Sequence, residues 1–444
     1  MSIGSFGGLN TALSGVTAQQ RALDVTAHNI ANVETPGYSR QEAVFGVRPS
    51  LNVPAGAKLD GTGAQLGQGV DVMTYRRLRD DFLDLQYRAQ NMTGGQADVT
   101  AQRLGLAQDA LGSGDAELGK QLDKFWSSWQ TLAANPQSAS AKSAVVGIAQ
   151  TLAQRFATLD SDFNTIGTQA TAAVTDLLSA QGPIKPIADE LAKLNTQINM
   201  QQGVGQPNDL LDRRDLLLDQ LSRYGQVSVT PDPTLDAQGQ PAYPGMVQVS
   251  FGGATTPLVS QGTVTMPTTA TLSATPGGQI GGLQDVAGKV AGYRTTLSGL
   301  ASSIITSVNA DASSPVFSGT GATDMAVVAT SATISAGVSG GPAGDNSVAL
   351  AIAALRGGTV DTGYAGLIST IGSDVRTAEG NSSTSASVLD SLTARRQSVA
   401  GVSMDEEMSN MIRYQRGYQA AARALTTMDE MLDTLINSTG RVGI

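Results

Sequence analysis

The 444-residue sequence contains no cysteine and a single histidine, His28. The absence of cysteine excludes disulfide bridges, thiol nucleophiles and cysteine-ligated zinc sites. A catalytic triad or a multi-histidine metal site would depend on His28 alone, and we expect this residue to be an ordinary exposed or interfacial member of a helix. We therefore predict no catalytic residue, no metal site and no cofactor, and we do not expect an enzyme.

Charged and aromatic residues are also scarce. Charged residues make up 15% of the chain and aromatic residues 4%, whereas charged residues usually make up about 25% of a globular protein. The formal net charge is -10, and nucleic acids and anionic membranes bind basic surfaces. We expect no nucleic-acid partner and a surface of small residues that suits close packing between copies of the chain.

The sequence lacks long apolar runs as well. The segment Met1–Phe6 has neither the charged start nor the continuous apolar core of a secretory signal peptide. No run reaches about 18 apolar residues, the length that predicts a transmembrane helix. We expect no membrane insertion, and any export should use a route without a cleaved signal peptide.

What the sequence does contain is the same apolar rhythm at both ends. Apolar residues recur there at alternating steps of four and three, which predicts helices with one apolar stripe, and Gln20 and Gln415 each interrupt a stripe. A lone polar residue in such a seam can fix the register between the two arms. Isolated helices of this length are marginal in water, so the other arm, other copies or both must cover the stripes. With one neighbouring row, the predicted assembly residues are Leu9, Leu13, Val16, Gln20, Leu23, Ala27, Ile30, Met404, Met408, Met411, Tyr414, Gln415, Tyr418, Ala422, Leu425, Met428, Leu432 and Ile436.

The boundaries of the terminal helices have local signals. Pro36 disfavours helical geometry for Thr35, so the first helix should end near Val33. Ser403 can cap the last helix while Glu406 reaches back in a capping box. That helix should end at Gly440.

The middle of the chain predicts a helical scaffold with β insertions. Glycines and prolines suggest a hairpin within residues 46–75, and helical periodicity returns at Arg76. The predicted fold class is mainly α with inserted β: paired terminal coiled-coil helices, a helical rod-like domain and a small outer β domain. The predicted domains are 1–40 with 404–444 for the terminal helices, 41–224 with 284–403 for the rod-like domain, and 225–283 for the β domain.

Four aspartates follow one another at helical spacing, at positions 209, 212, 215 and 219. Such carboxylates can bind a cation. We prefer to interpret them as the start of a helix, because Asn208 can cap it, acids favour its first turn, and Asp209 lies four residues before Arg213.

Two further motifs have structural interpretations. Gly114–Lys120 has the spacing of a phosphate-binding loop, but Gln121 stands where that loop needs serine or threonine, so we expect a turn between helices. Phe125, Trp126 and Trp129 belong to a periodic apolar row, which favours core packing over an aromatic binding platform.

Two terminal segments resemble known signatures. Ala31–Gln41 resembles the N-terminal signature of the flagellar axial proteins, the rod, hook and hook-associated family of bacterial flagella, and Ser403–Met408 with Tyr414–Arg423 resembles its C-terminal counterpart. Phe125–Pro136 and Pro207–Asp215 are similar to segments of the hook-associated members.

The resemblance implies a structural adaptor that joins the hook to the filament outside the cell. It implies a ring of copies, with the hook protein on one side and a second junction protein or flagellin on the other. It also implies passage from the cytoplasm through the flagellar type III exporter, with an export chaperone at the C-terminal region. Two alternatives stay open: another axial subunit of the hook, distal rod or flagellin type, or a secreted adhesin or hydrolase with helical arms.

Overall fold

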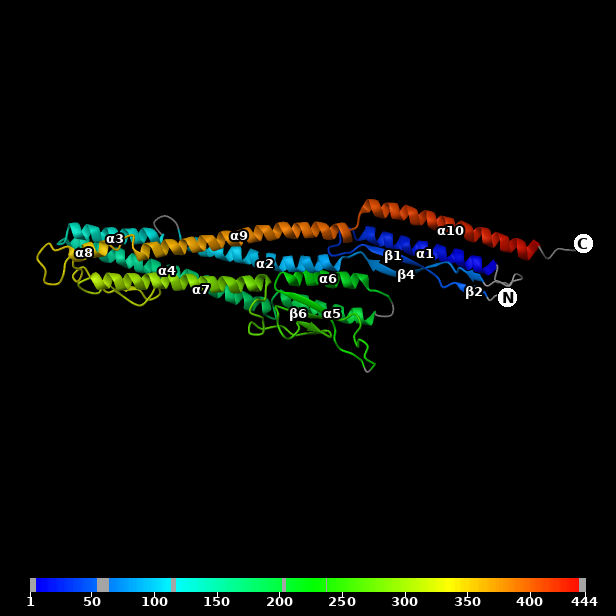
Figure 1. Ribbon diagram of the computed structural model, residues 1–444, viewed down its shortest axis with the longest axis horizontal. Helices are drawn as coiled ribbons and strands as arrows, with labels where there is room; N and C mark the ends of the chain where they lie inside the picture. The colour runs from blue at the N-terminus through cyan, green and yellow to red at the C-terminus, as the bar shows by residue number, and fades with distance from the viewer. Residues whose placement is uncertain (1–4, 54–63, 113–116, 202–204, 237, 439–444) are drawn as a thin grey trace, which may run out of the picture.

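The computed structural model describes residues 5–53, 64–112, 117–201, 205–236 and 238–438. In these residues the molecule is a long rod, with the two termini at the same end (Figure 1). The helices are α1 Ser5–Ala31, α2 Asp81–Ala110, α3 Leu118–Ala134, α4 Ala139–Leu178, α5 Ile184–Met200, α6 Asn208–Ser222, α7 Gly278–Asp311, α8 Ser347–Ala353, α9 Thr359–Ala400 and α10 Met404–Ser438. The strands are β1 Gln41–Val47, β2 Leu51–Val53, β3 Ala64–Leu66, β4 Val70–Arg77, β5 Val227–Pro231, β6 Val247–Phe251, β7 Val259–Ser260, β8 Thr263–Val264, β9 Phe317–Ser318 and β10 Ala326–Val327.

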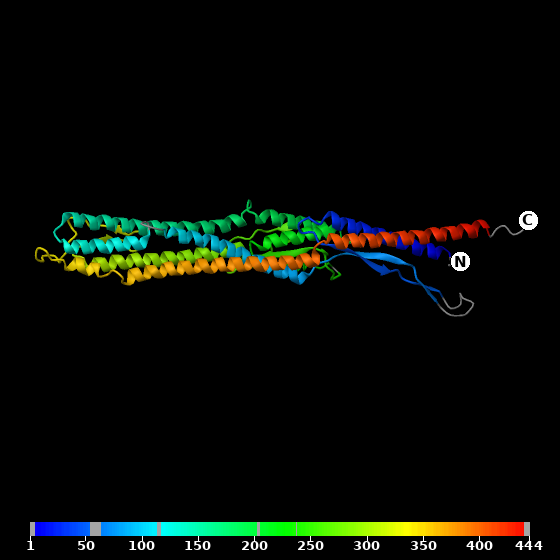
Figure 2. The same cartoon turned by 90° about the horizontal axis from the view of Figure 1, so that it is seen from above.

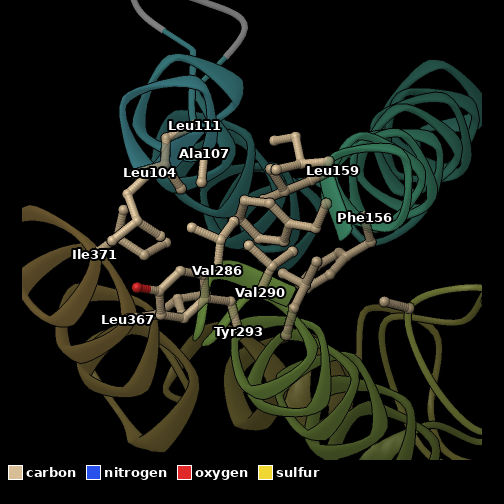
Figure 3. Close-up of a cluster of buried hydrophobic side chains, with 14 of the residues drawn as sticks. Leu104, Ala107, Leu111, Phe156, Leu159, Val286, Val290, Tyr293, Leu367 and Ile371 are labelled. Atoms are coloured by element: carbon tan, nitrogen blue, oxygen red, sulfur yellow. The ribbon is translucent and has the colours of Figure 1, made fainter. Parts of the chain in front are cut away.

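Long helices that run side by side form most of the rod. Helix α2 packs against α7 and α9, and α4 packs against α7 and α3. In Figure 3 the side chains of Leu104, Phe156, Val290 and Ile371 converge from α2, α4, α7 and α9 on one apolar interior. The mainly helical fold class is confirmed.

The aromatic row on α3 is part of this interior. Phe125, Trp126 and Trp129 are almost completely buried, and Phe125 makes edge-to-face contacts with both tryptophans. Trp126 Nε1 donates a hydrogen bond to Asp361. The prediction of core packing for these aromatic residues is confirmed.

A small antiparallel sheet in the order β5-β6-β7-β8 lies beside α5 and α6, about halfway along the rod (Figure 1). Val249, Phe251 and Val259 are fully buried and belong to the same apolar cluster as the helices. The amide of Asn195 on α5 donates a hydrogen bond to Val247 O and accepts one from Val247 N. The sheet is therefore anchored on α5 and shares the core of the rod.

The terminal helices form a separate pair at one end of the rod. Helices α1 and α10 run antiparallel, side by side in both views (Figures 1 and 2). The ribbon of β1 and β4 lies against α1, and its strands pair from Gln41 with Arg77 to Val47 with Val70. The ribbon turns away from α10 toward its tip (Figure 2).

Local signals set the ends of these elements, and two of these ends differ from expectation. Helix α2 begins at Asp81, because Arg76 is still in β4 opposite Glu42 and Asp80 accepts the capping hydrogen bond from Phe82 N. Ser403 accepts a hydrogen bond from Glu406 N at 3.5 Å, but the Glu406 carboxylate binds Arg40 and does not complete a capping box. Gly440, the predicted end of α10, lies outside the described residues.

Candidate assembly surface at the paired terminal helices

The turn after α1 folds back onto that helix through the side chain of Asn29. Asn29 is 1% exposed; its amide donates to Gln41 O and accepts from Gln41 N, each at 2.9 Å. The hydroxyl of Tyr38 also donates to Asn29 Oδ1, at 2.7 Å. Gly37 has φ of 81°, and a Cβ at this position would lie 3.0 Å from Leu216 Cβ on α6. The signature turn therefore needs glycine and has a structural role.

Arg40, in the same turn, connects α1 to α10. Its Nε donates to Glu407 Oε1 at 2.7 Å, and its Nη1 donates to Glu406 Oε2 at 2.6 Å. Glu407 also accepts a hydrogen bond from Asn29. Burial would lower the pKa of Arg40, but the two glutamates outweigh it and raise this pKa. The backbone N–H of Arg40 donates to Ala400 O, so one residue holds the end of α9, the start of α10 and the turn.

The aspartate row on α6 attaches the terminal unit to the rod. By terminal unit we mean α1, α10, the turn after α1 and the ribbon of β1 and β4. Asp212 accepts from Ser39 N and from Arg77, and Asp215 binds Arg77 and Arg79. The same row continues with Asp219, which binds Arg88 on α2 and Arg396 on α9.

These arginines determine the charge state of the row. Burial would raise the pKa of Asp215, but the positive charges of Arg79, Arg77 and Arg88 outweigh burial and lower it. Among the residues that the structure describes, no group of three His, Cys, Asp or Glu side chains is placed to hold a metal ion. The row therefore acts as an ion-pair network between β4, α2, α6 and α9.

The first residues of α6 differ from our prediction. Asn208 does not cap the helix; its amide donates to Gln41 Oε1 and to Tyr75 O and so holds the β ribbon. Asp209 accepts from Gln41, while Arg213 binds Glu190 on α5. The predicted cap by Asn208 and the predicted pairing of Asp209 with Arg213 were therefore wrong, because long-range partners displace the local ones. His28 is exposed, with Nε2 at 3.4 Å from Asp209.

Helices α1 and α10 meet through small residues. A Cβ at Gly8 would lie 3.1 Å from the Met428 side chain, and one at Gly15 would lie 3.5 Å from Ala421 Cβ. The side chain of Gln19 lies over Gly417 in the same way. In these pairs, and in the pair of Asn29 with Glu407, the two residue numbers always add up to 436, which defines one antiparallel register.

The predicted seam residues lie partly outside this contact. Leu13 is 52% exposed, Met404 44%, Met408 48% and Tyr418 37%, and Gln20, Ala27 and Gln415 are also exposed. The side chain of Ile436 lies outside those that the structure describes. The partly buried members are Leu9, Val16, Leu23, Ile30, Met411, Tyr414, Ala422, Leu425, Met428 and Leu432.

Two corrections follow for the pairing of the arms. The arms of one chain meet through the neighbouring face of small residues, so the α1 stripe is not the centre of an intramolecular coiled coil. Gln20 and Gln415 do not set the register between these arms, because both lie at the surface. A repeat of small residues at Gly8, Gly15 and Ala22, spaced by seven, was the signal in the sequence that predicts the contact.

No helix in the described residues has the length and apolarity needed to cross a membrane. The phosphate-loop-like segment lies partly outside the described residues, and α3 already begins within it, at Leu118.

Three family models match separate parts of the chain. "Flagellar hook-associated protein FlgK helical domain" matches residues 104–317. "Flagella basal body rod protein" matches residues 9–38, and "Flagellar basal body rod FlgEFG protein C-terminal" matches residues 396–438. The two basal-body rod models thus match the terminal helices. The hook-associated model matches the long helices in the middle of the chain.

Full-length relatives decide the family. Flagellar hook-associated protein 1 of Bacillus subtilis (strain 168) is 30% identical over 507 aligned positions, which cover 98% of this chain and 99% of that protein. The chain belongs to the flagellar hook-associated protein 1 family. The Escherichia coli (strain K12) member is 25% identical over 97% of this chain and 99% of its own length. The member from Salmonella typhimurium (strain LT2) is 33% identical over 50% of this chain and 39% of its own length.

Among solved structures, the flagellar hook junction protein FlgK from Burkholderia pseudomallei is similar, with a TM-score of 0.43 and 23% identity over 52% of this chain and 46% of that chain. The resemblance to the axial family and the prediction of a structural, hook-associated protein of the flagellum are confirmed by the family membership. The hook-associated protein 1 relatives are structural proteins of the flagellum, which lies outside the cell.

Proposed function

We propose that this chain is a non-enzymatic adaptor that joins the flagellar hook to the filament. Copies form a ring, which contacts the hook protein on one side and a second junction protein or flagellin on the other. The observation that carries this proposal is the pair α1 and α10 at one end of the rod. The two helices pack against each other through small residues, and larger apolar side chains on both helices stay exposed.

The exposed side chains of the terminal pair form the proposed contact surface between copies. Leu13 on α1 and Met404, Met408 and Tyr418 on α10 are each at least 37% exposed. Large apolar side chains that gather on one part of a surface often mark protein interaction sites. In the assembled ring, the remaining predicted residues would extend the same surface.

The domain organisation follows from this placement. Segments 1–40 and 404–444 form the inner assembly domain, 41–224 with 284–403 form the rod-like domain, and residues 225–283 form the outer β region. The position of the sheet beside α5, away from the terminal pair, supports this order (Figure 1).

Export is the second part of the proposal. The chain leaves the cytoplasm through the flagellar exporter without a cleaved signal peptide, and a chaperone covers the C-terminal region beforehand. The exposed methionines of α10 support this step, because flexible methionine side chains adapt to more than one partner.

Electron microscopy of cells that lack this chain tests the proposal. We expect hooks without attached filaments, and filaments should return when the full chain is supplied. A chain without residues 404–444 should be a soluble monomer that does not restore them. Normal filaments in the deletion strain would overturn the proposal, and long polymers of the purified chain would favour a hook, rod or flagellin-type subunit.

A further inference from the structure

A cavity of about 490 Å³ lies where the rod-like domain meets the terminal unit, and we call it the junction groove. Helix α2 contacts both α6 and α9 (Figure 1), and all three helices line the groove. Its apolar lining includes Leu83 and Tyr87 on α2, Leu216 on α6 and Val399 on α9. Val399 is 40% exposed and the other three are half-buried. Ligand pockets usually measure roughly 300 to 1,000 Å³, so the groove has room for large side chains.

The far side of α2 carries two exposed apolar side chains at the same level of the rod. Phe82 and Leu85 are each 65% exposed. At 3.6 residues per turn, their mean direction lies roughly 150° around the helix from that of Leu83 and Tyr87 in the groove. Along the helix axis the two pairs differ by only about 2 Å. One helix thus presents an apolar projection on one side and the junction groove on the other.

We propose that Phe82 and Leu85 of one copy insert into the junction groove of the next copy, between its α6 and α9. The inference rests on the proposed function and deepens it, because it adds a contact between rod-like domains to the ring of copies. The two surfaces of the contact are different, so each copy can bind one neighbour on either side. Such head-to-tail contacts close into a ring when the rotation between neighbours permits it. The equal level of the two surfaces keeps neighbouring copies at the same height.

The chemistry of the groove suits an apolar occupant. The guanidinium of Arg396 lies 4.3 Å from the centre of the Tyr87 ring, and it binds Asp84 and Asp219 at 2.8 Å each. These charges therefore pair with one another, and the flat faces of the guanidinium and the ring remain suited to stacking with an aromatic side chain. Phenylalanine is enriched in the buried centres of protein interfaces. The Phe82 ring of a second copy has this chemistry.

Disulfide formation between copies can test the contact, because the natural chain has no cysteine. Gln220 and Gln397 are exposed residues at the groove, on α6 and α9. Flagella that contain full chains with Leu85→Cys together with full chains with Gln220→Cys or Gln397→Cys should give linked dimers on oxidation. A disulfide needs Cβ atoms about 3.5 to 4.5 Å apart, so it reports direct contact. Each variant alone should give little product, because the two surfaces differ.

A double variant tests whether the contact continues from copy to copy. Leu85→Cys with Gln397→Cys in one chain should give a ladder of linked copies longer than a dimer, since α2 separates the two positions within each copy. The matched control replaces Leu85→Cys by Leu106→Cys, an exposed position about 32 Å further along α2, and should give no ladder. Efficient linking by Leu85→Cys alone, or no product in either mixture, would overturn the inference.

Substitutions on the two surfaces should produce the same defect. Phe82→Ser with Leu85→Ser removes the apolar projection, and Val399→Asp places a charge in the groove. Each should weaken the contact on the order of tenfold or more and leave fewer hooks with filaments. These side chains are exposed in the monomer, so its helix content and unfolding midpoint should not change. Leu106→Ser is the matched control and should keep normal filaments.

The outcomes separate this inference from the proposed function. If the natural chain fails to restore filaments to cells that lack it, the proposed function fails. If the natural chain and the Phe82→Ser, Leu85→Ser variant restore them equally well, the adaptor function stands and the groove contact is wrong. Loss of filaments in that variant without any disulfide product between copies would assign Phe82 and Leu85 to a different partner and overturn the choice of a second copy.

Discussion

Arg40 and Glu407 lie 367 residues apart in the sequence and are joined by a hydrogen bond of 2.7 Å. The Glu407 side chain is 2% exposed, whereas that of Glu406, the second partner of Arg40, is 62% exposed. The buried pair therefore fastens the start of α10 to the turn that follows α1. The exposed pair adds a contact that water screens.

Removal of Glu407 should destabilise the terminal unit strongly. Glu407→Ala removes the buried acceptor of Arg40 Nε and of the Asn29 amide, and breaking a buried pair in this way costs about 3 to 5 kcal/mol. The matched control is Glu406→Ala, which should lower the free energy of unfolding by less than about 1 kcal/mol. Denaturant unfolding of the purified monomers compares the two. Equal losses in both variants would mean that burial does not determine the strength of the pair.

Acid should weaken the attachment of the terminal unit through Asp215. Its pKa in the folded protein is lowered from the ordinary value of 3.8, so the ionised group stabilises the fold above that value. This stabilisation is lost as the pH falls from about 4 through the lower pKa of the folded state. The free energy of unfolding, measured between pH 7 and pH 3, should therefore decrease below pH 4.

Asp215→Asn tests the assignment of this acid sensitivity. The variant should be less stable at pH 7 and should lose less stability below pH 4, because it lacks the titrating carboxyl group. Asp429→Asn, an exposed residue on α10, should keep the steep decrease of the natural chain. Identical slopes for both variants would assign the effect to other carboxyl groups, such as Asp160 beside Arg294.

The sequence predicted the elements better than their partners. The apolar periodicity of Phe125 and Trp129 correctly predicts that both lie in the core, because burial of an apolar side chain does not require one particular partner residue. The aspartates of α6 were interpreted from neighbours four residues away, whereas Asp212 binds Arg77 of β4 and Asp215 binds Arg88 of α2. Local spacing does not contain information about a partner more than a hundred residues away.

The terminal pair shows the same limit at a finer scale. The alternating steps of four and three correctly predict two helices, and the same spacing predicts a contact through large side chains such as Leu13. The pair instead uses Gly8 and Gly15, because small residues allow a closer approach of the two backbones. The register between α1 and α10 determines which stripe is covered within one chain. The apolar period of each helix does not determine that register.

This close approach predicts opposite effects of two substitutions at Gly15. A Cβ would lie 3.5 Å from Ala421 Cβ, an ordinary contact, so Gly15→Ala should be neutral or stabilising by up to about 1 kcal/mol through helix propensity. Gly15→Leu should push α10 away and destabilise by about 1 to 3 kcal/mol, the usual effect of overpacking. Thermal unfolding followed by circular dichroism distinguishes the variants, and a stable Gly15→Leu protein would contradict the observed contact.

The exposed stripe predicts a defect in assembly without a defect in folding. Leu13→Ala with Met408→Ala should change the free energy of unfolding of the monomer by no more than about 0.5 kcal/mol for each residue, because both side chains face solvent. If neighbouring copies bury them, each substitution should lose on the order of 1 kcal/mol or more at every contact, and fewer hooks should carry filaments. The matched control is Leu350→Ala on α8, which is 53% exposed at the opposite end of the rod. Filament counts by electron microscopy should fall for the double variant and not for the control; an equal fall in both would locate the contact elsewhere.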